Sequence, residues 1–435
     1  MYQETVQELF SFIESSPTAF HAVDNMKQML DKEGYTQLLE GSHWELSEGG
    51  KYYVIRNGSS MIAFRIPKRD FTGFQIMASH SDSPSFKIKE QPEMETDHVY
   101  IRLNVERYGG MLMAPWFDRP LSVAGRLIVR EEGRIVVKLV SVDRDLVLIP
   151  NLSIHMNRDS NDGYKYNVQK DLLPLYGGAE AKGTFMGRIA EAAGVEERKI
   201  LGSDLFLYNR MKGSVWGAQD EFISIGRLDD LQCVFASLKA FLSSEGGESI
   251  PVHCVFDNEE VGSSTKQGAA STFLYDTLNR MNEGLGRTPM EYRQAVALSF
   301  MVSADNAHAV HPNYPEKACP SNRPYLNQGI VIKYSANQKY TTDGVSAALF
   351  RKICERAKVP FQIFLNRSDM VGGSTLGSLS GNQVAVNCVD IGLPQLSMHS
   401  PYETAGVKDT QYLIQAGKIF FESSVKEERY GVYVL

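Results

Sequence analysis

The stretch "MASHSDSPSF", Met77 to Phe86, ends an apolar run with a histidine and an aspartate one residue apart. The run from Phe74 to Ala78 predicts a buried strand, and Pro84 indicates a turn after it. Ser-Asp-Ser-Pro is also common turn chemistry, because Asp and Ser bond nearby backbone groups and Pro presets a turn dihedral. His80 and Asp82 therefore fit either a plain turn or a functional strand end, and the rest of the sequence must decide.

The composition is that of an ordinary globular protein. Of its residues, 43% are hydrophobic and 22% are charged. The length of 435 residues suits roughly two to three domains. The net charge of -7 argues against a nucleic-acid partner. The five scattered cysteines favour free thiols in a reducing cytoplasm. The first residues do not resemble a secretory signal, and no apolar run of about 18 residues predicts a membrane span. We therefore expect a cytoplasmic protein without a membrane partner.

Helical and strand patterns alternate at both ends of the chain, whereas its middle is rich in strands. Helical spacing of apolar residues predicts helices near 6–13, 22–32, 227–242 and 345–359. Buried strands are predicted at 52–57, 61–67, 73–80, 250–256, 296–305, 329–335, 361–366 and 383–392. Between them, 99–150 is dense in β-branched residues, 127–139 predicts a hairpin, and 177–185 is the loosest stretch. The pattern indicates an α/β layer fold with an inserted, strand-rich second domain.

Four further stretches carry metal-type ligands at or near the end of an apolar segment, where open α/β sheets place their sites. These are Glu259 and Glu260 after 250–256, Asp305 at the end of 296–305, His399 in a loop, and Asp229 and Asp230 at the start of a helix. Each alone has an ordinary explanation, such as a helix cap for Asp229 or an Asx turn for Asp305. Glu259 and Glu260 could form an exposed acidic turn, and His399 could be a core histidine.

Together these residues favour a metal site. Imidazole and carboxylate ligands without cysteine suit zinc, and also manganese or cobalt. Two metals close together require a bridging carboxylate, and two adjacent glutamates can divide ligation and proton transfer. His308 and His311 lie three residues apart, a spacing that a helix can use to present two ligands. However, the segment around them is rich in Pro and Asn and does not favour a helical turn.

Seven motifs occur in order along nearly the whole chain: "SHSDSP" (79–84), "RLDDL" (227–231), "DNEEVGS" (257–263), "SADNAHAVHPNY" (303–314), "KYSANQKY" (333–340), "DMVGGSTLG" (369–377) and "PQLSMHS" (394–400). With these motifs the chain resembles the aspartyl aminopeptidases, a family of co-catalytic zinc exopeptidases of bacteria and eukaryotes. It differs from the family's usual residues at Ser81, Asp230 and Asn258, none of which is an expected ligand.

The resemblance implies a fold, a cofactor and the residues that hold it. It implies an α/β, mixed-sheet, three-layer zinc-exopeptidase domain formed by 1–86 plus 227–435, with 87–226 as an inserted β-rich dimerisation domain. Two zinc ions per subunit are expected, with manganese or cobalt as substitutes. The implied ligands are His80 and Asp305 on one ion, Glu260 and His399 on the other, and Asp229 as the bridge.

The same resemblance assigns the chemistry. Asp82 would accept the second ring N–H of His80, and Glu259 would be the general base toward the water that the metal pair activates. The peptide bond between Asp229 and Asp230 is expected to be cis, as in related co-catalytic zinc peptidases.

The implied substrates are short peptides with an N-terminal Asp or Glu. Lys333 would lie near the pocket for the first side chain, although it could equally be a solvated strand-end lysine. The other expected substrate-binding residues are His155, Tyr340, Met370, Gly372 and Gly373. His155 is either an ordinary loop or core histidine, or it reaches a neighbouring subunit's active site within dimers that assemble into a tetrahedral dodecamer.

Three alternatives stay open at this point. The first is another co-catalytic zinc hydrolase, such as a deacylase or a carboxypeptidase. The second is an aminopeptidase of neutral preference. The third is a non-catalytic assembly or cargo protein, against which an intact Glu259 argues.

Overall fold

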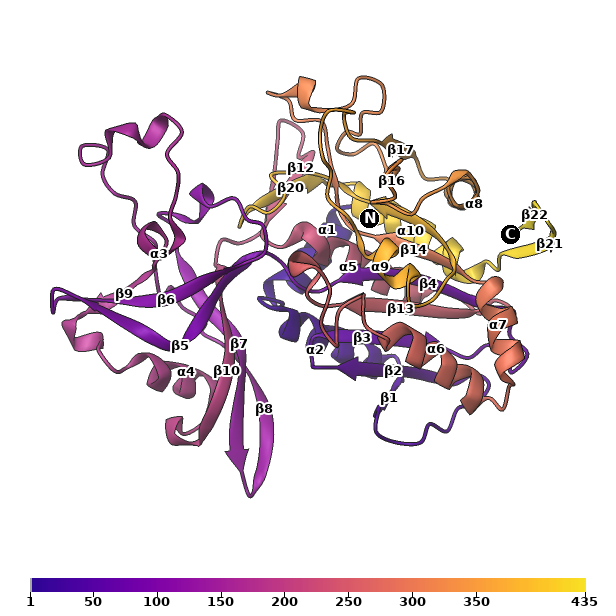
Figure 1. The fold of residues 1–435 in the computed structure, drawn as a ribbon, viewed down its shortest axis with the longest axis horizontal. Coiled ribbons are helices and arrows are strands. Elements are labelled where there is room, and N and C mark those ends of the chain that lie inside the picture. The colour runs from indigo at the N-terminus through magenta and orange to yellow at the C-terminus, as the bar shows by residue number, and fades with distance from the viewer. Residues whose placement is uncertain (1) are drawn as a thin grey trace.

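The computed structural model describes residues 2–435, and its larger part has three layers around a nine-stranded mixed sheet (Figure 1). Across the sheet, the strands are β1 (Thr36–Leu38), β2 (Lys51–Arg56), β3 (Ser60–Arg65), β13 (Ile250–Phe256), β4 (Phe74–His80), β14 (Phe300–Ala304), β18 (Asn387–Gly392), β16 (Ile330–Lys333) and β17 (Phe361–Phe364). The central strands β13, β4, β14 and β18 run parallel to one another, so that their carboxyl ends meet at one edge.

Helices cover both faces of this sheet. One core lies beneath α1 (Tyr2–Glu14), α2 (Ala19–Lys32), α5 (Leu228–Ser243), α8 (Gly344–Ala357) and α10 (Asp409–Glu422). The other lies beneath α6 (Phe273–Gly284), α7 (Pro289–Ala297) and α9 (Leu376–Gly381). Met77 of β4 packs into the first core, and its neighbours Ile76 and Ala78 pack into the second. Strands buried on both faces explain why their sequences are continuous apolar runs rather than alternating ones.

The inserted domain is built on a six-stranded antiparallel sheet. Its strands, in order, are β8 (Arg134–Ser141), β7 (Leu121–Glu131), β10 (Ile200–Asn209), β5 (Ser85–Thr96), β6 (Tyr100–Tyr108) and β9 (Leu175–Gly178). The predicted hairpin is confirmed as β7–β8. The expectation that 177–185 is loose is wrong, because it contains the end of β9, a 3-10 helix (Ala179–Ala181) and the first residue of α4 (Phe185–Ala193).

A third sheet joins the insert to the C-terminal part of the chain. Its order is β11 (Ser214–Trp216), β12 (Phe222–Ile225), β20 (Glu403–Gly406), β19 (Pro394–Leu396) and β15 (Ala307–His308). Residues 214–225 precede the predicted boundary at 226, yet β12 pairs with β20. Among the described residues, the remaining α-helix is α3 (Val168–Asp171), and the remaining strands form the hairpin of β21 (Lys426–Arg429) with β22 (Val432–Val434).

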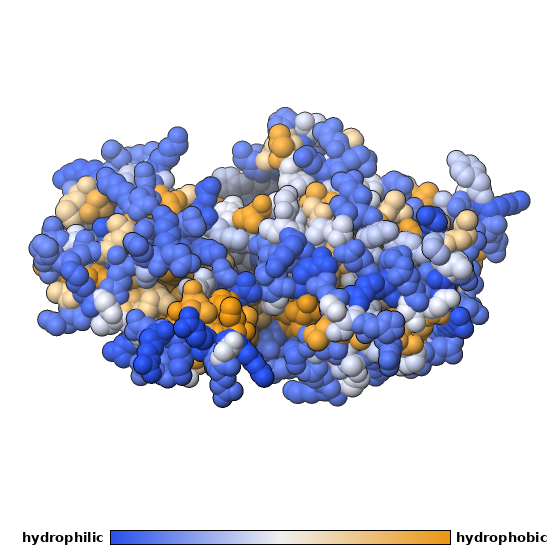
Figure 2. Space-filling view, turned by 60° about the horizontal axis from the view of Figure 1, so that its bottom comes forward, coloured by the Kyte–Doolittle hydropathy of each residue, from blue (hydrophilic) through white to orange (hydrophobic). Residues whose placement is uncertain are grey.

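The surface is mainly hydrophilic, but hydrophobic residues gather over the inserted domain on the face shown in Figure 2. Edge strand β8 of that domain exposes Ile135 and Val137, at 72% and 54% of their surface. Among the described residues, no helix has both the length and the apolar character needed to cross a membrane.

Candidate metal centre

The five predicted ligands gather near the carboxyl ends of the central strands, three from those ends and two from other segments. His80 is the last residue of β4, Asp305 follows β14, and Glu260 lies in the 3-10 helix Glu259–Val261 after β13. Asp229 lies at the start of α5, and His399 lies in the loop between β19 and β20. Three groups have ligand atoms within 4.8 Å of one another: His80, Asp229, Asp230 and Asp305; His80, Glu259 and Glu260; and Asp229, Glu260 and His399.

Asp229 lies between the two histidines and presents one oxygen to each. Its Oδ1 is 3.4 Å from His80 Nε2, and its Oδ2 is 3.4 Å from His399 Nε2. Asp229 does not cap α5, because Arg227 occupies the cap position and Asp229 has non-helical dihedrals. The predicted cis peptide between Asp229 and Asp230 is confirmed. This placement suits a carboxylate that bridges two cations.

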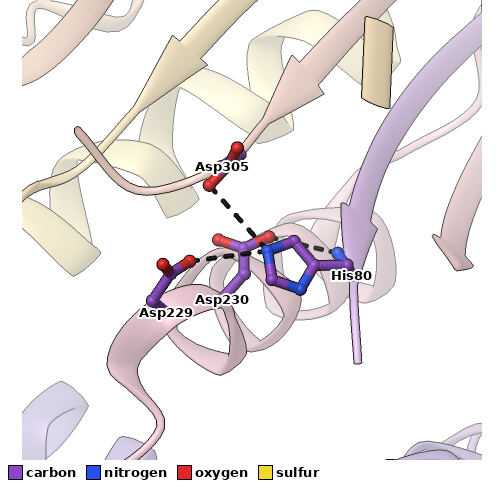
Figure 3. Close-up of side chains that lie close together, drawn as sticks. All are labelled: His80, Asp229, Asp230 and Asp305. Atoms are coloured by element: carbon purple, nitrogen blue, oxygen red, sulfur yellow. Dashed lines mark hydrogen bonds and ion pairs between the residues drawn. The ribbon is translucent and has the colours of Figure 1, made fainter. Parts of the chain in front are cut away.

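The first half of the centre is formed by His80, Asp229 and Asp305 (Figure 3). His80 is buried, and its Nε2 is 3.9 Å from Asp305 Oδ1. Its Nδ1 bonds the backbone carbonyl of Asp82 at 3.0 Å, whereas the predicted partner, the Asp82 carboxylate, is farther away at 3.4 Å. The carbonyl therefore fixes the tautomer that leaves the Nε2 lone pair for a metal. The backbone N–H of His80 donates to Asp230 Oδ2 at 3.1 Å.

The second half is formed by His399, Glu260 and Asp229. His399 Nε2 lies 3.4 Å from Glu260 Oε2, and its Nδ1 bonds the backbone carbonyl of Gly110. Buried Glu403 accepts the N–H of His399 at 2.7 Å and the N–H of Asp229 at 3.0 Å. The sequence prediction missed Glu403, although an acidic residue beside the "PQLSMHS" motif was a signal for it.

The Asp82 carboxylate holds the two glutamates rather than the histidine. Its Oδ1 accepts the Glu259 N–H at 3.1 Å, and its Oδ2 accepts the Glu260 N–H at 3.2 Å. The hydroxyl of Tyr108, from the end of β6, donates to Oδ2 at 2.7 Å. Tyr108 was also missed, because a tyrosine at a strand end carries no metal-type signal.

The donors at the centre fit bound zinc. Burial raises the pKa of Glu259 to about 8 and also raises the pKa of Glu260 and Asp230 well above the usual range. Burial and the neighbouring carboxylates both oppose ionisation of these groups, so the site favours added positive charge. Among the described residues, the buried oxygens Asp229 Oδ1, Asp230 Oδ1 and Glu260 Oε1 also have no hydrogen-bond partner. Two imidazoles and several carboxylates without thiolate are zinc ligands.

Lys333, at the end of β16, is buried rather than solvated. Its Nζ donates to the Asn306 carbonyl at 2.9 Å and lies 3.7 Å from Asp305 Oδ2. It also lies 5.4 Å from the centre of the buried Tyr340 ring. Burial lowers the pKa of Lys333, but the nearby Asp305 and other groups raise it by more, so the net shift is upward and the side chain stays cationic.

The other predicted substrate-binding residues lie in exposed loops. Met370 is 45% exposed. A Cβ on Gly372 would meet the Asn366 side chain at 2.1 Å, whereas one on Gly373 would meet nothing within 4 Å. Close approach to a neighbouring residue therefore explains why position 372 is a glycine, but it does not explain the glycine at 373. His155 is exposed in the insert and lies outside the ligand groups found among residues 2–435.

Comparisons with known proteins agree over nearly the whole chain. A family model described as aminopeptidase I zinc metalloprotease (M18) matches residues 12–421. The chain is 45% identical to a probable M18 family aminopeptidase 2 of Clostridium acetobutylicum, covering 96% of this chain and 98% of the relative. It is 40% identical to a protein of the same name from Pseudomonas aeruginosa, covering 98% and 99%.

Solved structures of similar fold also match nearly the whole chain. A chain in the cryo-EM structure of the Ape4 and Nbr1 complex is 35% identical with a TM-score of 0.94, covering 97% of this chain and 86% of that one. A chain of the S. cerevisiae mApe1 dodecamer is 29% identical with a TM-score of 0.85, covering 97% of each.

Replacing one ligand should remove metal without unfolding the protein. In His399→Ala we expect the zinc bound per chain to fall by roughly half, because the second half of the centre loses its only imidazole. Elemental analysis after gel filtration measures the content. His311→Ala is the control, because it removes a histidine of the neighbouring motif that lies outside the ligand groups described among residues 2–435. Full zinc content in His399→Ala would exclude His399 as a ligand.

Proposed function

The chain belongs to the M18 family of zinc metallo-aminopeptidases, and from that premise we propose that it removes N-terminal Asp or Glu from short peptides, using two zinc ions and Glu259 as general base. Membership already makes it a zinc-dependent exopeptidase. The main support for two ions is Asp229, which faces a different histidine with each of its carboxylate oxygens.

The metal centre and Glu259 have separate parts in the proposed reaction. When bound, the zinc pair supplies a Lewis acid toward the peptide carbonyl and the attacking water. Glu259 takes the proton from that water and passes it to the leaving amine. Its backbone N–H is held by Asp82, which fixes the turn that carries the carboxylate. Family membership favours this function over a deacylase, a carboxypeptidase or a cargo protein.

A cation beside the centre supports the acidic preference. Lys333 is the buried ammonium nearest the ligand Asp305, and it keeps its charge, so that it can attract a substrate carboxylate at the first position. Tyr340 packs beside it, and Met370, Gly372 and Gly373 are the walls that we propose for the pocket. An aminopeptidase of neutral preference is the alternative. Only an acidic preference predicts that removing the Lys333 charge weakens cleavage of Asp-peptides more than cleavage of Leu-peptides.

Subunit assembly completes the proposal. The S. cerevisiae relative mApe1 is a dodecamer by its description, and we propose that this chain forms dimers through its insert and then a tetrahedral dodecamer. The exposed aliphatic side chains of β8 support a contact there, as do Leu152, Ile154 and Met156, which are all exposed around His155. In a two-fold dimer, His155 would reach the partner subunit's centre reciprocally.

The variant Glu259→Gln should keep its zinc and lose nearly all turnover. Loss of a general base costs typically about 10²- to 10⁴-fold in kcat, whereas the amide preserves side-chain shape. Steady-state kinetics on Asp-peptides and elemental analysis of the same preparation provide the two readouts. A variant with full zinc and near-normal kcat would show that another group is the base.

The variant Lys333→Met should weaken acidic substrates selectively. We expect kcat/KM for Asp- and Glu-peptides to fall by about 10-fold or more, because a charge-assisted contact is lost, while Leu-peptides change little. Zinc content is measured alongside, since Lys333 also contacts Asp305. Equal losses on Asp- and Leu-peptides at full zinc content would remove Lys333 from the account of specificity.

Mixing two inactive variants tests the role of His155. His155→Ala and Glu259→Gln are combined under conditions that exchange subunits, as verified by mass spectrometry of tagged chains. If His155 acts on the partner subunit's centre, mixed dimers contain one complete site and activity returns. If exchange is proven and activity stays flat, the histidine does not act across the interface.

A further inference from the structure

The corner that follows β6 of the inserted domain lies against the second half of the metal centre. The Gly110 carbonyl bonds the His399 ring. Gly109 has a φ of +77°, and a Cβ there would lie 3.2 Å from the Glu260 Cβ. Residues 108–112, which we call the β6 corner, therefore form one wall of the centre although they belong to the insert.

Tyr108 connects this corner to the turn that carries Glu259. Its hydroxyl donates to Asp82 Oδ2 at 2.7 Å and accepts from Asn258 Nδ2 at 2.8 Å. Asp82 in turn accepts the N–H groups of Glu259 and Glu260. One phenol thus contacts the residue before the two glutamates and the carboxylate that holds both of their amides.

The inserted sheet sets the position of this phenol. The Tyr108 ring packs edge-on against Phe206 of β10, with centroids 5.6 Å apart, and Lys87 lies 5.7 Å over the Phe206 ring. Burial and the Asp82 charge raise the pKa of Tyr108, so the hydroxyl keeps its proton and remains a donor. The geometry of the Glu259 turn therefore depends on a residue whose place is fixed by another domain.

We propose that Tyr108 is a positioning residue for hydrolysis: its hydroxyl orients the Asp82 carboxylate and the Asn258 side chain, which together place Glu259 against the substrate water. This inference rests on the function of Glu259 proposed above. It gives the inserted domain a part in its own subunit's centre, separate from any contact between subunits.

The variant Tyr108→Phe isolates this role, because it keeps the ring against Phe206 and removes only the hydroxyl. We expect kcat to fall on the order of 10-fold, as when a hydrogen bond to a charged group is lost. KM, zinc content and oligomeric state should stay close to those of the wild type. Tyr208→Phe is the matched control, because it removes another tyrosine hydroxyl of the insert, one that donates to the Val142 carbonyl at 3.1 Å.

A double-mutant cycle with Asp82→Asn separates positioning from general damage. If Tyr108 acts through Asp82, adding Tyr108→Phe to Asp82→Asn causes little further loss of kcat, whereas independent effects would multiply. A merely structural role would lower thermal stability or zinc content in Tyr108→Phe and leave the kcat of correctly loaded enzyme unchanged.

Three outcomes would overturn the inference: a wild-type kcat in Tyr108→Phe, losses equal to those of Tyr208→Phe, or multiplicative losses in the cycle. Failure of the proposed function looks different. In that case Glu259→Gln retains activity, or the wild type does not cleave peptides at their N-terminus. If Glu259→Gln is inactive while Tyr108→Phe is normal, only the positioning role is lost.

Discussion

The position of one carboxylate, that of Asp229, sets the geometry of the centre. Its two oxygens face two histidines from segments far apart in the chain, so a small rotation would disturb both halves at once. The backbone around it is held on both sides: the Ser83 hydroxyl donates to the Asp229 carbonyl at 2.8 Å, and Glu403 accepts the Asp229 N–H. Bonds of this kind around a ligand determine how well it presents its oxygens.

The concentration of acid at one sheet edge makes folding and metal binding depend on each other. Burying several carboxylates together is costly unless cations neutralise them. A metal that binds the folded chain and not the unfolded one adds its binding energy to stability. The sheet holds these carboxylates in place against their mutual repulsion, because its central strands are buried on both faces in two separate cores.

The sequence predicted the parts of the fold and centre that arise from local pattern. Continuous apolar runs indicated the buried strands, and metal-type residues at their ends, such as His80 and Asp305, indicated ligands. Tyr108 could not be found in this way, because its hydroxyl acts through Asp82 and Asn258, which are distant in sequence. Glu403 carried a signal beside the His399 motif, but its bond to the distant Asp229 backbone appears only in the folded chain. Burial of Lys333 likewise depends on neighbours that only the folded chain brings near. Which oxygen of the nearby Asp82 meets the His80 ring is set by the local backbone, which the sequence pattern does not specify.

The order of the proposed ligands along the chain also limits when the centre can form during synthesis. His80 is made before the insert, Asp229 is made after it, and His399 is made much later than both. Helix α10, which packs against α5, is made later still. A nascent chain therefore carries an incomplete centre, without the activity proposed for it, until the segment that contains His399 has been synthesised.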